Sequence, residues 1–444
     1  MDRRAFLRSS GLAAGGALLL QHSPVQAEPA TGTPTGASGT QPSAARAERQ
    51  PVVAPGGQRA VITPNGTSLP FRRVGGTKVA HVIAEPIEHE FAPGLRAQCW
   101  GYNGRTPGPT IEVTEGDHVR IYLTNRLPEE TSLHWHGVLV PNGMDGVAGL
   151  TQPAVKPGET FKYEFTFTRP GTYMYHPHFD EMTQMALGMV GMIVVHPRAP
   201  HGPSVDRDFV LMTHEWKIRA GARRPDPTAM LDFNVLTFNS KAFPGTEALW
   251  VRRGDRVRIR LGNLSAMDHH PIHLHGCYFH VTATDGGDVP QSAQHPETTV
   301  LVPVGGTRVI EFVADLPGDW AMHCHMTHHV MNQMGHDIPV TLGSDGQRID
   351  RRVQSLVPDY MTMGQTGMGE MGAMGMPVPH NSIPMMGGQG PFGRIDMGGM
   401  FTMIKVRDTA EELAQRSEYR HPAGTVAALA NDHDMAADGI DPRG

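Results

Sequence analysis

One pattern of sequence occurs twice in this chain. The run "IEVTEGDHVRIYLTNRL" at 111–127 matches "LWVRRGDRVRIRLGNLS" at 249–265, and "TRPGTYMYHPH" at 168–178 matches "DLPGDWAMHCH" at 315–325. Both copies alternate apolar and polar residues between Gly and Pro turns, which is the pattern of half-buried strands. The repeat therefore predicts two copies of one β-sandwich, and an all-β fold.

The repeated units set the expected domain boundaries. We expect a first sandwich over 61–200 and a second over 205–345, and the 444-residue chain has room for both. The formal net charge is −6 and the charges are dispersed. The sequence has no basic stripe that would indicate nucleic-acid binding. It also has no acidic run that would indicate a cation-buffering tail.

Four stretches carry a His-x-His pair at the ends of corresponding strands. In a strand, residues two apart project to the same face, so each pair presents two imidazoles together. The pairs are His134 and His136, His176 and His178, His273 and His275, and His323 and His325. Eight imidazoles exceed the four ligands that a zinc ion usually takes, and they favour a cluster of several metal ions.

A second ligand set surrounds one of these pairs. Cys324 lies between His323 and His325, so its side chain projects to the opposite face of the strand. The remaining candidates nearby are His270, His329 and Met334. Two imidazoles, a thiolate and a weak axial thioether are the ligands of a blue-copper electron-transfer site.

The motifs "HWHG", "YHPH", "HPIHLHG" and "HCHMTHHVMNQM" resemble, in order and spacing, the four copper-binding motifs of the multicopper oxidases. The resemblance covers about residues 70 to 345 and implies cupredoxin-like Greek-key domains with copper as cofactor. It assigns the type 2 copper ligands to His134 and His273. It assigns the type 3 pair to His136, His176, His178, His275, His323 and His325. It assigns the type 1 site, in the second domain, to His270, Cys324, His329 and Met334.

The gap between the second and third motifs selects a branch of the family. About ninety residues separate His178 from His270, too few for a further sandwich of roughly 100 residues. The chain therefore resembles the two-domain, small laccase-like bacterial branch. That branch builds each cluster between domains of neighbouring subunits, which implies a homotrimer.

The resemblance implies a reaction as well. One-electron oxidations of a reductant, either Cu(I) or another metal ion or a phenol, would be coupled to reduction of dioxygen to water, with electrons entering through His329 and Cys324. Asp145, in "GMDGV", matches an acidic position near the cluster and is a candidate proton relay, although an Asp-Gly turn explains it equally well. Some relatives carry a second acid where this chain has Val330, which leaves the second proton route open.

Two other classes of protein compete with an oxidase. Copper nitrite reductases are also two-domain trimers, but they need only a mononuclear type 2 copper, and eight paired histidines argue against them. A copper-binding or storage protein of copper resistance would not need a complete blue-copper site.

A Met/Gly-rich segment at 357–403 follows the second sandwich, with eleven methionines. Thioethers bind Cu(I) well, so the segment favours a cuprous reductant and copper tolerance. Methionines that cover an apolar patch are the alternative, and phenols remain open as reductants. Residues 404–444 are expected to form a tail.

The N-terminus indicates export. Residues 1–27, with Arg3 and Arg4 before a short apolar run and Ala27, resemble a twin-arginine signal peptide, and 28–60 reads as a disordered linker. We therefore expect a periplasmic or otherwise exported protein without a membrane span. Cys99 and Cys277 remain outside the metal site, and two buried thiols are favoured over a disulfide.

Overall fold

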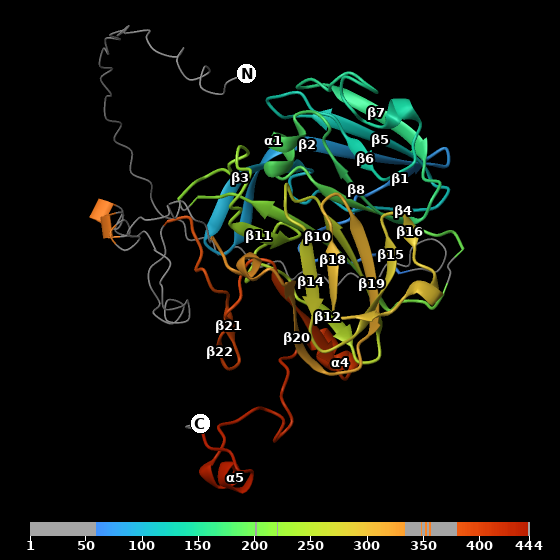
Figure 1. The fold of residues 1–444 in the computed structure, drawn as a ribbon. Coiled ribbons are helices and arrows are strands. Elements are labelled where there is room, and N and C mark those ends of the chain that lie inside the picture. Colours follow the sequence, from blue (N-terminus) through green and yellow to red (C-terminus); the bar gives the residue numbers. More distant parts are fainter. Residues whose placement is uncertain are drawn as a thin grey trace, which may run out of the picture. The chain divides into compact units, whose positions relative to one another are not determined.

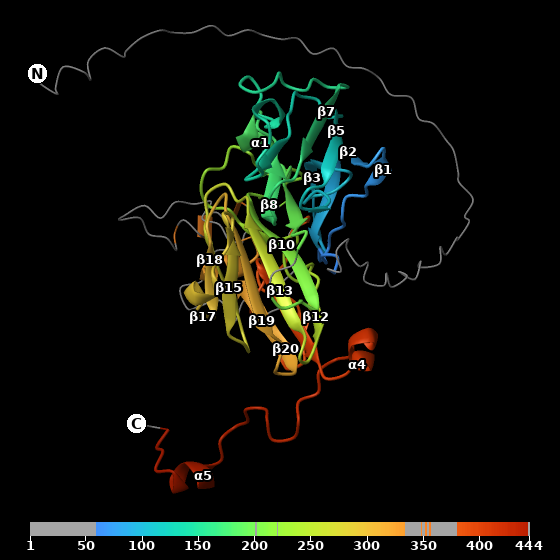
Figure 2. The same cartoon turned by 90° about the vertical axis from the view of Figure 1, so that its right-hand side faces the viewer.

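The structure is a computed structural model that describes residues 59–199, 202–219, 221–333, 348, 351–352, 355–356 and 380–442. The described chain is mostly strands with a few short helices, and its strands form two successive β-sandwiches (Figures 1 and 2). The predicted all-β fold with two tandem cupredoxin-like sandwiches is confirmed.

The first sandwich combines a five-stranded and a four-stranded sheet. The larger sheet has the order β1-β2-β5-β7, with β3 paired to β2. Its strands are β1 (Arg72–Val74), β2 (Thr77–Ala92), β3 (Leu95–Tyr102), β5 (His118–Asn125) and β7 (Thr160–Thr166). The smaller sheet, in the order β4-β9-β8-β6, has the strands β4 (Ile111–Thr114), β6 (His134–His136), β8 (Gly171–His176) and β9 (Gly191–His196).

The second sandwich repeats this arrangement with more strands. Its seven-stranded sheet has the order β11-β10-β13-β19-β15-β16, with β17 paired to β15, and the other sheet has the order β12-β23-β20-β14-β18. The strands of the larger sheet are β10 (Arg207–Trp216), β11 (Val235–Phe238), β13 (Arg256–Asn263), β15 (Phe279–Thr284), β16 (Gly287–Asp288), β17 (Pro296–Glu297) and β19 (Thr307–Val313). Those of the smaller sheet are β12 (Leu249–Arg252), β14 (His270–Leu274), β18 (Thr299–Val302), β20 (Gly318–Cys324) and β23 (Phe401–Arg407).

Alternation along the strands builds both cores. In β5, Val119, Ile121 and Leu123 are fully buried while the residues between them are partly exposed. In β13, Val257 and Ile259 occupy the same positions in the second core. The repeated sequence thus places equivalent residues inside each sandwich.

The last strand of the second sandwich comes late in the sequence. In the first sandwich, β9 is antiparallel to β8 and parallel to β4. In the second, β23 is antiparallel to β20 and parallel to β12, so β23 is the counterpart of β9. From the sequence we expected the second sandwich to end at 345 and residues 404–444 to form a tail. In the structure, residues 401–407 form a strand of the smaller sheet of this sandwich. In sequence, the Met/Gly-rich segment at 357–403 therefore follows β20 and ends within β23.

Other elements are short. The helices are α1 (Glu181–Ala186), α4 (Ala410–Gln415) and α5 (Asp432–Ala437), with 3-10 turns η1 (Asn142–Met144), η2 (Gln291–Ala293) and η3 (Thr327–Val330). A small hairpin pairs β21 (Gln389–Gly390) with β22 (Gly393–Arg394). None of the helices formed by described residues has the length and apolar character needed to cross a bilayer. The expected signal peptide at 1–27, most of the linker, and 357–379 lie outside the described residues.

Candidate functional site

The four His-x-His pairs lie at neighbouring strand ends in each sandwich. In the first, β6 pairs with β8 so that His134 is opposite His176. In the second, β14 pairs with β20 so that His273 is opposite His323. The histidines therefore form two groups, which we call the first group (His134, His136, His176 and His178) and the second group (His273, His275, His323 and His325).

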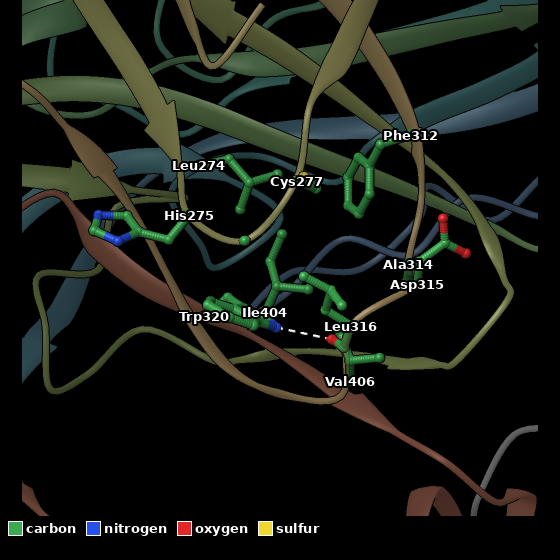
Figure 3. Close-up of a pocket in the computed structure, with 11 residues that line it drawn as sticks. Leu274, His275, Cys277, Phe312, Ala314, Asp315, Leu316, Trp320, Ile404 and Val406 are labelled. Atoms are coloured by element: carbon green, nitrogen blue, oxygen red, sulfur yellow. Dashed lines mark hydrogen bonds between the residues drawn. The ribbon is translucent and has the colours of Figure 1, made fainter. Parts of the chain in front are cut away.

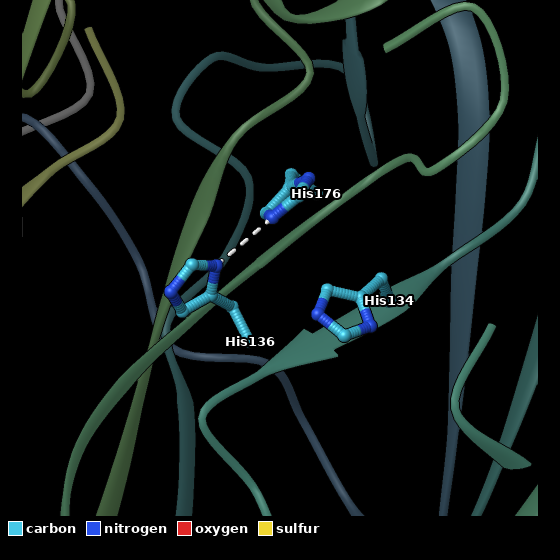
Figure 4. Close-up of side chains that lie close together, drawn as sticks. All are labelled: His134, His136 and His176. Atoms are coloured by element: carbon cyan, nitrogen blue, oxygen red, sulfur yellow. Dashed lines mark hydrogen bonds between the residues drawn. The ribbon is translucent and has the colours of Figure 1, made fainter. Parts of the chain in front are cut away.

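Three imidazoles of the first group, those of His134, His136 and His176, lie close together (Figure 4). Nδ1 of His136 lies 3.2 Å from Nε2 of His176. The ring of His134 is 5.3 Å from that of His176 and 5.5 Å from that of His178, measured between centroids. Ligand atoms of His134, His136 and His176 all lie within 4.8 Å of one another, a spacing that fits a metal site.

The second group has a similar arrangement. Nε2 of His275 lies 3.2 Å from Nε2 of His323. The ring of His273 is 5.6 Å from that of His323 and 5.5 Å from that of His325. Duplication of the sandwich has thus placed a set of four imidazoles in each domain.

Backbone carbonyls fix the orientation of these rings. Nδ1 of His134 donates to the carbonyl of Asp145, and Nδ1 of His273 donates to that of Thr298, each at 2.7 Å. His176 and His323 donate from Nδ1 to the carbonyl of the following residue, each at 2.9 Å. A ring that donates from Nδ1 leaves Nε2 as its lone-pair atom, so all four rings present Nε2 as a ligand.

The charge state of the rings also suits a metal. Burial lowers the pKa of His176 to about 3, and burial also lowers the pKa of His136, His275 and His323. These imidazoles are therefore neutral near pH 7, and a neutral imidazole is the form that binds a metal ion.

The two groups do not meet within this chain. Ring contacts join members of each group, and none joins the first group to the second, although the structure describes all eight residues. A Cβ atom placed on Gly305 would lie 3.7 Å from Cε1 of His136, so the turn before β19 neighbours the first group. The described residues thus hold the eight imidazoles as two separate groups of four.

Two carboxylates lie against the first group. Oδ1 of Asp145 is 3.5 Å from Nδ1 of His134. Glu181, at the start of α1, places one carboxylate oxygen 3.4 Å from Nδ1 of His176 and the other 3.7 Å from Nε2 of His178. Sequence reasoning missed Glu181, although its position three residues after His178 was a usable signal.

A second site brings together His270, Cys324 and His329. Sγ of Cys324 lies 3.4 Å from Nδ1 of His329 and 3.8 Å from Nδ1 of His270, and the two Nδ1 atoms are 3.2 Å apart. All three side chains are buried. The fourth predicted ligand, Met334, lies outside the described residues.

Neighbouring groups turn both imidazoles toward the thiol. Nε2 of His270 is hydrogen-bonded to Oγ of Ser265 at 2.7 Å. Nε2 of His329 lies 3.4 Å from the carboxylate of Asp268, another residue that sequence reasoning missed. Because Nε2 has a partner in each ring, Nδ1 is the atom left to bind a metal. Burial lowers the pKa of His270 to about 3 and raises that of the Cys324 thiol to about 12, so a metal ion must displace the thiol proton.

A buried carboxyl supports the loop before His270. Oε1 of Glu215 accepts hydrogen bonds from the backbone N–H of Met267 at 2.6 Å and of Asp268 at 3.3 Å. Burial, with a hydrogen bond and charge repulsion from Asp268, raises the pKa of Glu215 to about 8. Glu215 thus holds the backbone that carries Asp268 against His329.

A pocket beside His275 has a mainly apolar lining (Figure 3). Its wall includes Leu316 and Trp320, whose Nε1 donates to the carbonyl of Leu316 at 2.9 Å. Cys277 also lines this pocket, whereas Cys99 is buried in a separate cluster with Phe91 and Trp216. Both cysteines are free thiols.

Val330 occupies the position where some relatives carry the acid of a second proton route. Val330 is buried directly after His329. Asn332 is buried as well, and its side chain is hydrogen-bonded to the backbone at Phe243, Pro384 and Gly399. Neither residue provides a titratable group.

Known proteins resemble this chain over both sandwiches. A family model described as multicopper oxidase matches residues 84–200, and a second with the same description matches 219–344. Copper resistance protein A of Escherichia coli is 29% identical over 241 residues, which are 44% of this chain and 40% of that protein. A probable nitrite reductase-hydroxylamine oxidoreductase fusion protein of Kuenenia stuttgartiensis is 28% identical over 298 residues, which are 64% of this chain and 33% of the relative.

The chain thus spans less than half the length of these curated relatives. Among solved structures, the blue copper oxidase of Nitrosomonas europaea is similar, with a TM-score of 0.55 and 25% identity. That match covers 73% of this chain and 85% of the solved one. Both matched halves and the fold lead to one conclusion: the chain belongs to the multicopper oxidase family.

Proposed function

We propose that this protein is a laccase-like oxidase that couples one-electron oxidation of a reductant to reduction of dioxygen to water. One observation carries the proposal. The described residues combine two groups of four histidines with a separate, buried Cys324, His270 and His329 set. An electron-transfer site and a multi-ion site in one chain are what a four-electron reaction requires.

Copper, the metal of the family, fits both sets of residues. A thiolate with two imidazoles is a blue-copper ligand set, and imidazoles alone suit copper as well. We propose His270, Cys324 and His329 for type 1, His134 and His273 for type 2, and the other six paired histidines for type 3. When bound, copper supplies the one-electron redox steps that the side chains cannot.

The chain itself connects the two sites. Cys324 is bonded through the backbone to His323 and His325 on either side, so one strand end serves both. His329 has its outer edge against Asp268, whose side chain is 36% exposed. We propose that electrons enter at His329 and leave along the Cys324 backbone.

Assembly of several chains would complete the site formed by the paired histidines. Because the first and second groups do not meet within one chain, we propose that they meet between chains in a homotrimer. A closed ring of head-to-tail contacts gives each first group one second group from a neighbour.

Carboxylates at the first group handle protons in this proposal. Asp145 lies beside His134 and Glu181 beside His176 and His178. Dioxygen reduction consumes protons, and a carboxylate next to the ligands is placed to deliver them. We retain Asp145 as the relay and regard Glu181 as a second carboxylate that holds the rings.

The reductant remains a choice between Cu(I) or another metal ion and a phenol. The name of the Escherichia coli relative favours copper resistance, and so does the Met/Gly-rich segment. Residues 380–400 include backbone bonded to Asn332, so a deletion that tests the segment should be confined to 361–379. Loss of Cu(I) turnover with phenol turnover retained would support a cuprous reductant. Equal loss of both, or of neither, would remove the segment from the reaction.

Nitrite reduction is the second candidate, because the Kuenenia stuttgartiensis relative carries that name. A mononuclear type 2 site would use few of the eight paired histidines. Copper storage would leave the buried Cys324 site without a purpose. Whichever of these functions the protein has, we propose that residues 1–27 direct its export.

One assay distinguishes these functions. The purified, copper-loaded protein should consume dioxygen with Cu(I) or a phenol and release no hydrogen peroxide, since reduction proceeds to water. The same preparation, kept free of oxygen, should not reduce nitrite. Nitrite turnover without dioxygen consumption would establish the alternative, and the absence of both would favour storage.

A further inference from the structure

Met400 lies beside Cys324, although the two residues are far apart in sequence. Strands β20 and β23 pair with Ala321 opposite Met403, Met322 opposite Thr402 and His323 opposite Phe401. The next step of this register places Met400 opposite Cys324. The N–H of Cys324 donates to the carbonyl of Met400 at 3.1 Å, which continues the pairing.

Opposite residues of an antiparallel pair project to the same face of the sheet, with Cβ atoms about 4.5–5.5 Å apart. Met400 and Cys324 therefore point the same way. Both are fully buried in one apolar cluster, together with Met322 and Ile404. Phe401, by contrast, stacks on His323 on the other face. The Met400 side chain is thus on the face that carries the Cys324 thiol.

The backbone of Met400 is also bonded to the other ligand of this loop. Its N–H donates to the carbonyl of His329 at 2.9 Å, while the N–H of Gly398 donates to the carbonyl of Val330 at 2.6 Å. Gly399 has a φ of +55°, and a Cβ atom there would lie 2.3 Å from the His329 carbonyl oxygen. Only glycine permits this approach, so the sequence "GGM" fits the chain closely against His329.

Asn332, three residues after His329, also holds the backbone at Gly399 in place. Its Oδ1 accepts from the N–H of Gly399 at 2.8 Å, and its Nδ2 donates to the carbonyls of Phe243 at 3.0 Å and Pro384 at 3.1 Å. Asn332 is 1% exposed and both ends of its side chain are bonded, so it anchors the backbone at Gly399, directly before Met400. This network gives a structural role to a residue that the sequence left unassigned.

We propose that Met400 supplies the thioether of the type 1 site, in the role that motif spacing gave to Met334. The inference rests on the proposed copper site at His270, Cys324 and His329. A thioether is a weak axial ligand of blue copper and tunes its reduction potential. Strand β23 would then complete both the sandwich and the metal site.

The test compares four single variants of the full-length, copper-loaded protein. Met400→Leu removes the thioether at nearly constant volume, so the variant should fold. Met400→Gln replaces the thioether with an amide oxygen. Met403→Leu is the matched control, because Met403 lies on the same strand but on the opposite face, across from Ala321. Met334→Leu tests the residue chosen by spacing.

The readouts are the midpoint potential of the type 1 copper in a redox titration and its electron paramagnetic resonance spectrum. Loss of a thioether donor destabilises Cu(II), so Met400→Leu should raise the potential. A harder amide oxygen stabilises Cu(II), so Met400→Gln should lower it. Met403→Leu and Met334→Leu should retain the wild-type potential and spectrum.

Two outcomes overturn the inference in different ways. If the wild-type protein shows the intense thiolate-to-copper band and Met400→Leu leaves potential and spectrum unchanged, Met400 is not the ligand, and a shift in Met334→Leu would reinforce that result. If the wild-type protein lacks the band altogether, the type 1 site itself fails, and the inference fails with it.

Discussion

Sγ of Cys324 and Nδ1 of His329 lie 3.4 Å apart, on either side of the short loop that carries them. His270, from β14, completes the set with its own Nδ1 atom 3.8 Å from the thiol. Three soft or borderline donors converge in a buried place where water cannot compete for the metal. The loop and the neighbouring strand therefore form one preorganised ligand set.

Replacing the thiol tests this set. Cys324→Ser should abolish the intense visible band and oxidase turnover, because the hydroxyl is a poor copper ligand and gives no thiolate charge transfer. Copper bound to the paired histidines should largely remain in a metal analysis. Cys277→Ser is the control, since Cys277 lies in the apolar pocket beside His275. An unchanged visible spectrum in Cys324→Ser would contradict the assignment.

Asp145 can be tested without disturbing His134. The ring of His134 donates to the backbone carbonyl of Asp145, and this bond survives a change of side chain. Asp145→Asn should therefore keep its copper while turnover of dioxygen falls by roughly 100-fold, the size of a typical proton-transfer contribution. Steady-state oxygen uptake and copper content measure both. If Asp145→Asn turned over dioxygen at the wild-type rate, Asp145 would not be a proton relay and would serve only in the turn.

The raised pKa of Glu215 predicts that the free energy of unfolding depends on pH. Burial raises the pKa of this carboxyl to about 8 from an ordinary value of 4.5, so the folded state holds a proton that the unfolded state releases. The resulting stabilisation is present below pH 4.5 and is lost as pH rises through about 8, by roughly 1.4 kcal/mol for each unit of pKa shift.

Glu215→Gln should remove that dependence and keep an oxygen acceptor for the two backbone amides. Urea unfolding at pH 5 and at about pH 9 should therefore show a smaller decline for Glu215→Gln than for the wild type. Parallel declines in the two proteins would mean that Glu215 is not protonated in the folded state.

Much of this structure could be predicted from local sequence. Alternation around Val119 and Val257 predicted matching strands, and the two-residue spacing of His134 and His136 predicted a shared face. These properties follow from strand geometry alone, so one sequence suffices to find them. The predicted family membership is confirmed for the same reason, because short motifs carry it.

Contacts between distant segments could not be predicted in this way. Met400 reaches Cys324 only because β23 returns to the sheet after the Met/Gly-rich segment, and local patterns do not specify strand partners. Glu181 and Asp268 looked like ordinary acidic residues in turns. Their proximity to His176 and His329 depends on the path of the whole loop.

The central claim is that the first group of one chain and the second group of another together form one copper site. Mixing two inactive variants tests it most directly. One variant carries His134→Ala and His136→Ala, and the other carries His273→Ala and His275→Ala. Both keep His270, Cys324 and His329, so the visible band reports that each is folded and loaded.

If the chain forms the proposed homotrimer, co-expression of the two variants with different tags should yield mixed trimers. In a head-to-tail ring with random mixing, about a quarter of the sites combine an intact first group with an intact second group. Oxygen uptake and histidine-bound copper should therefore recover to about a quarter of the wild-type level, while each variant alone shows neither. Blue, trimeric mixtures that gain no activity and no copper would contradict the account, because each site would then be built within a single chain.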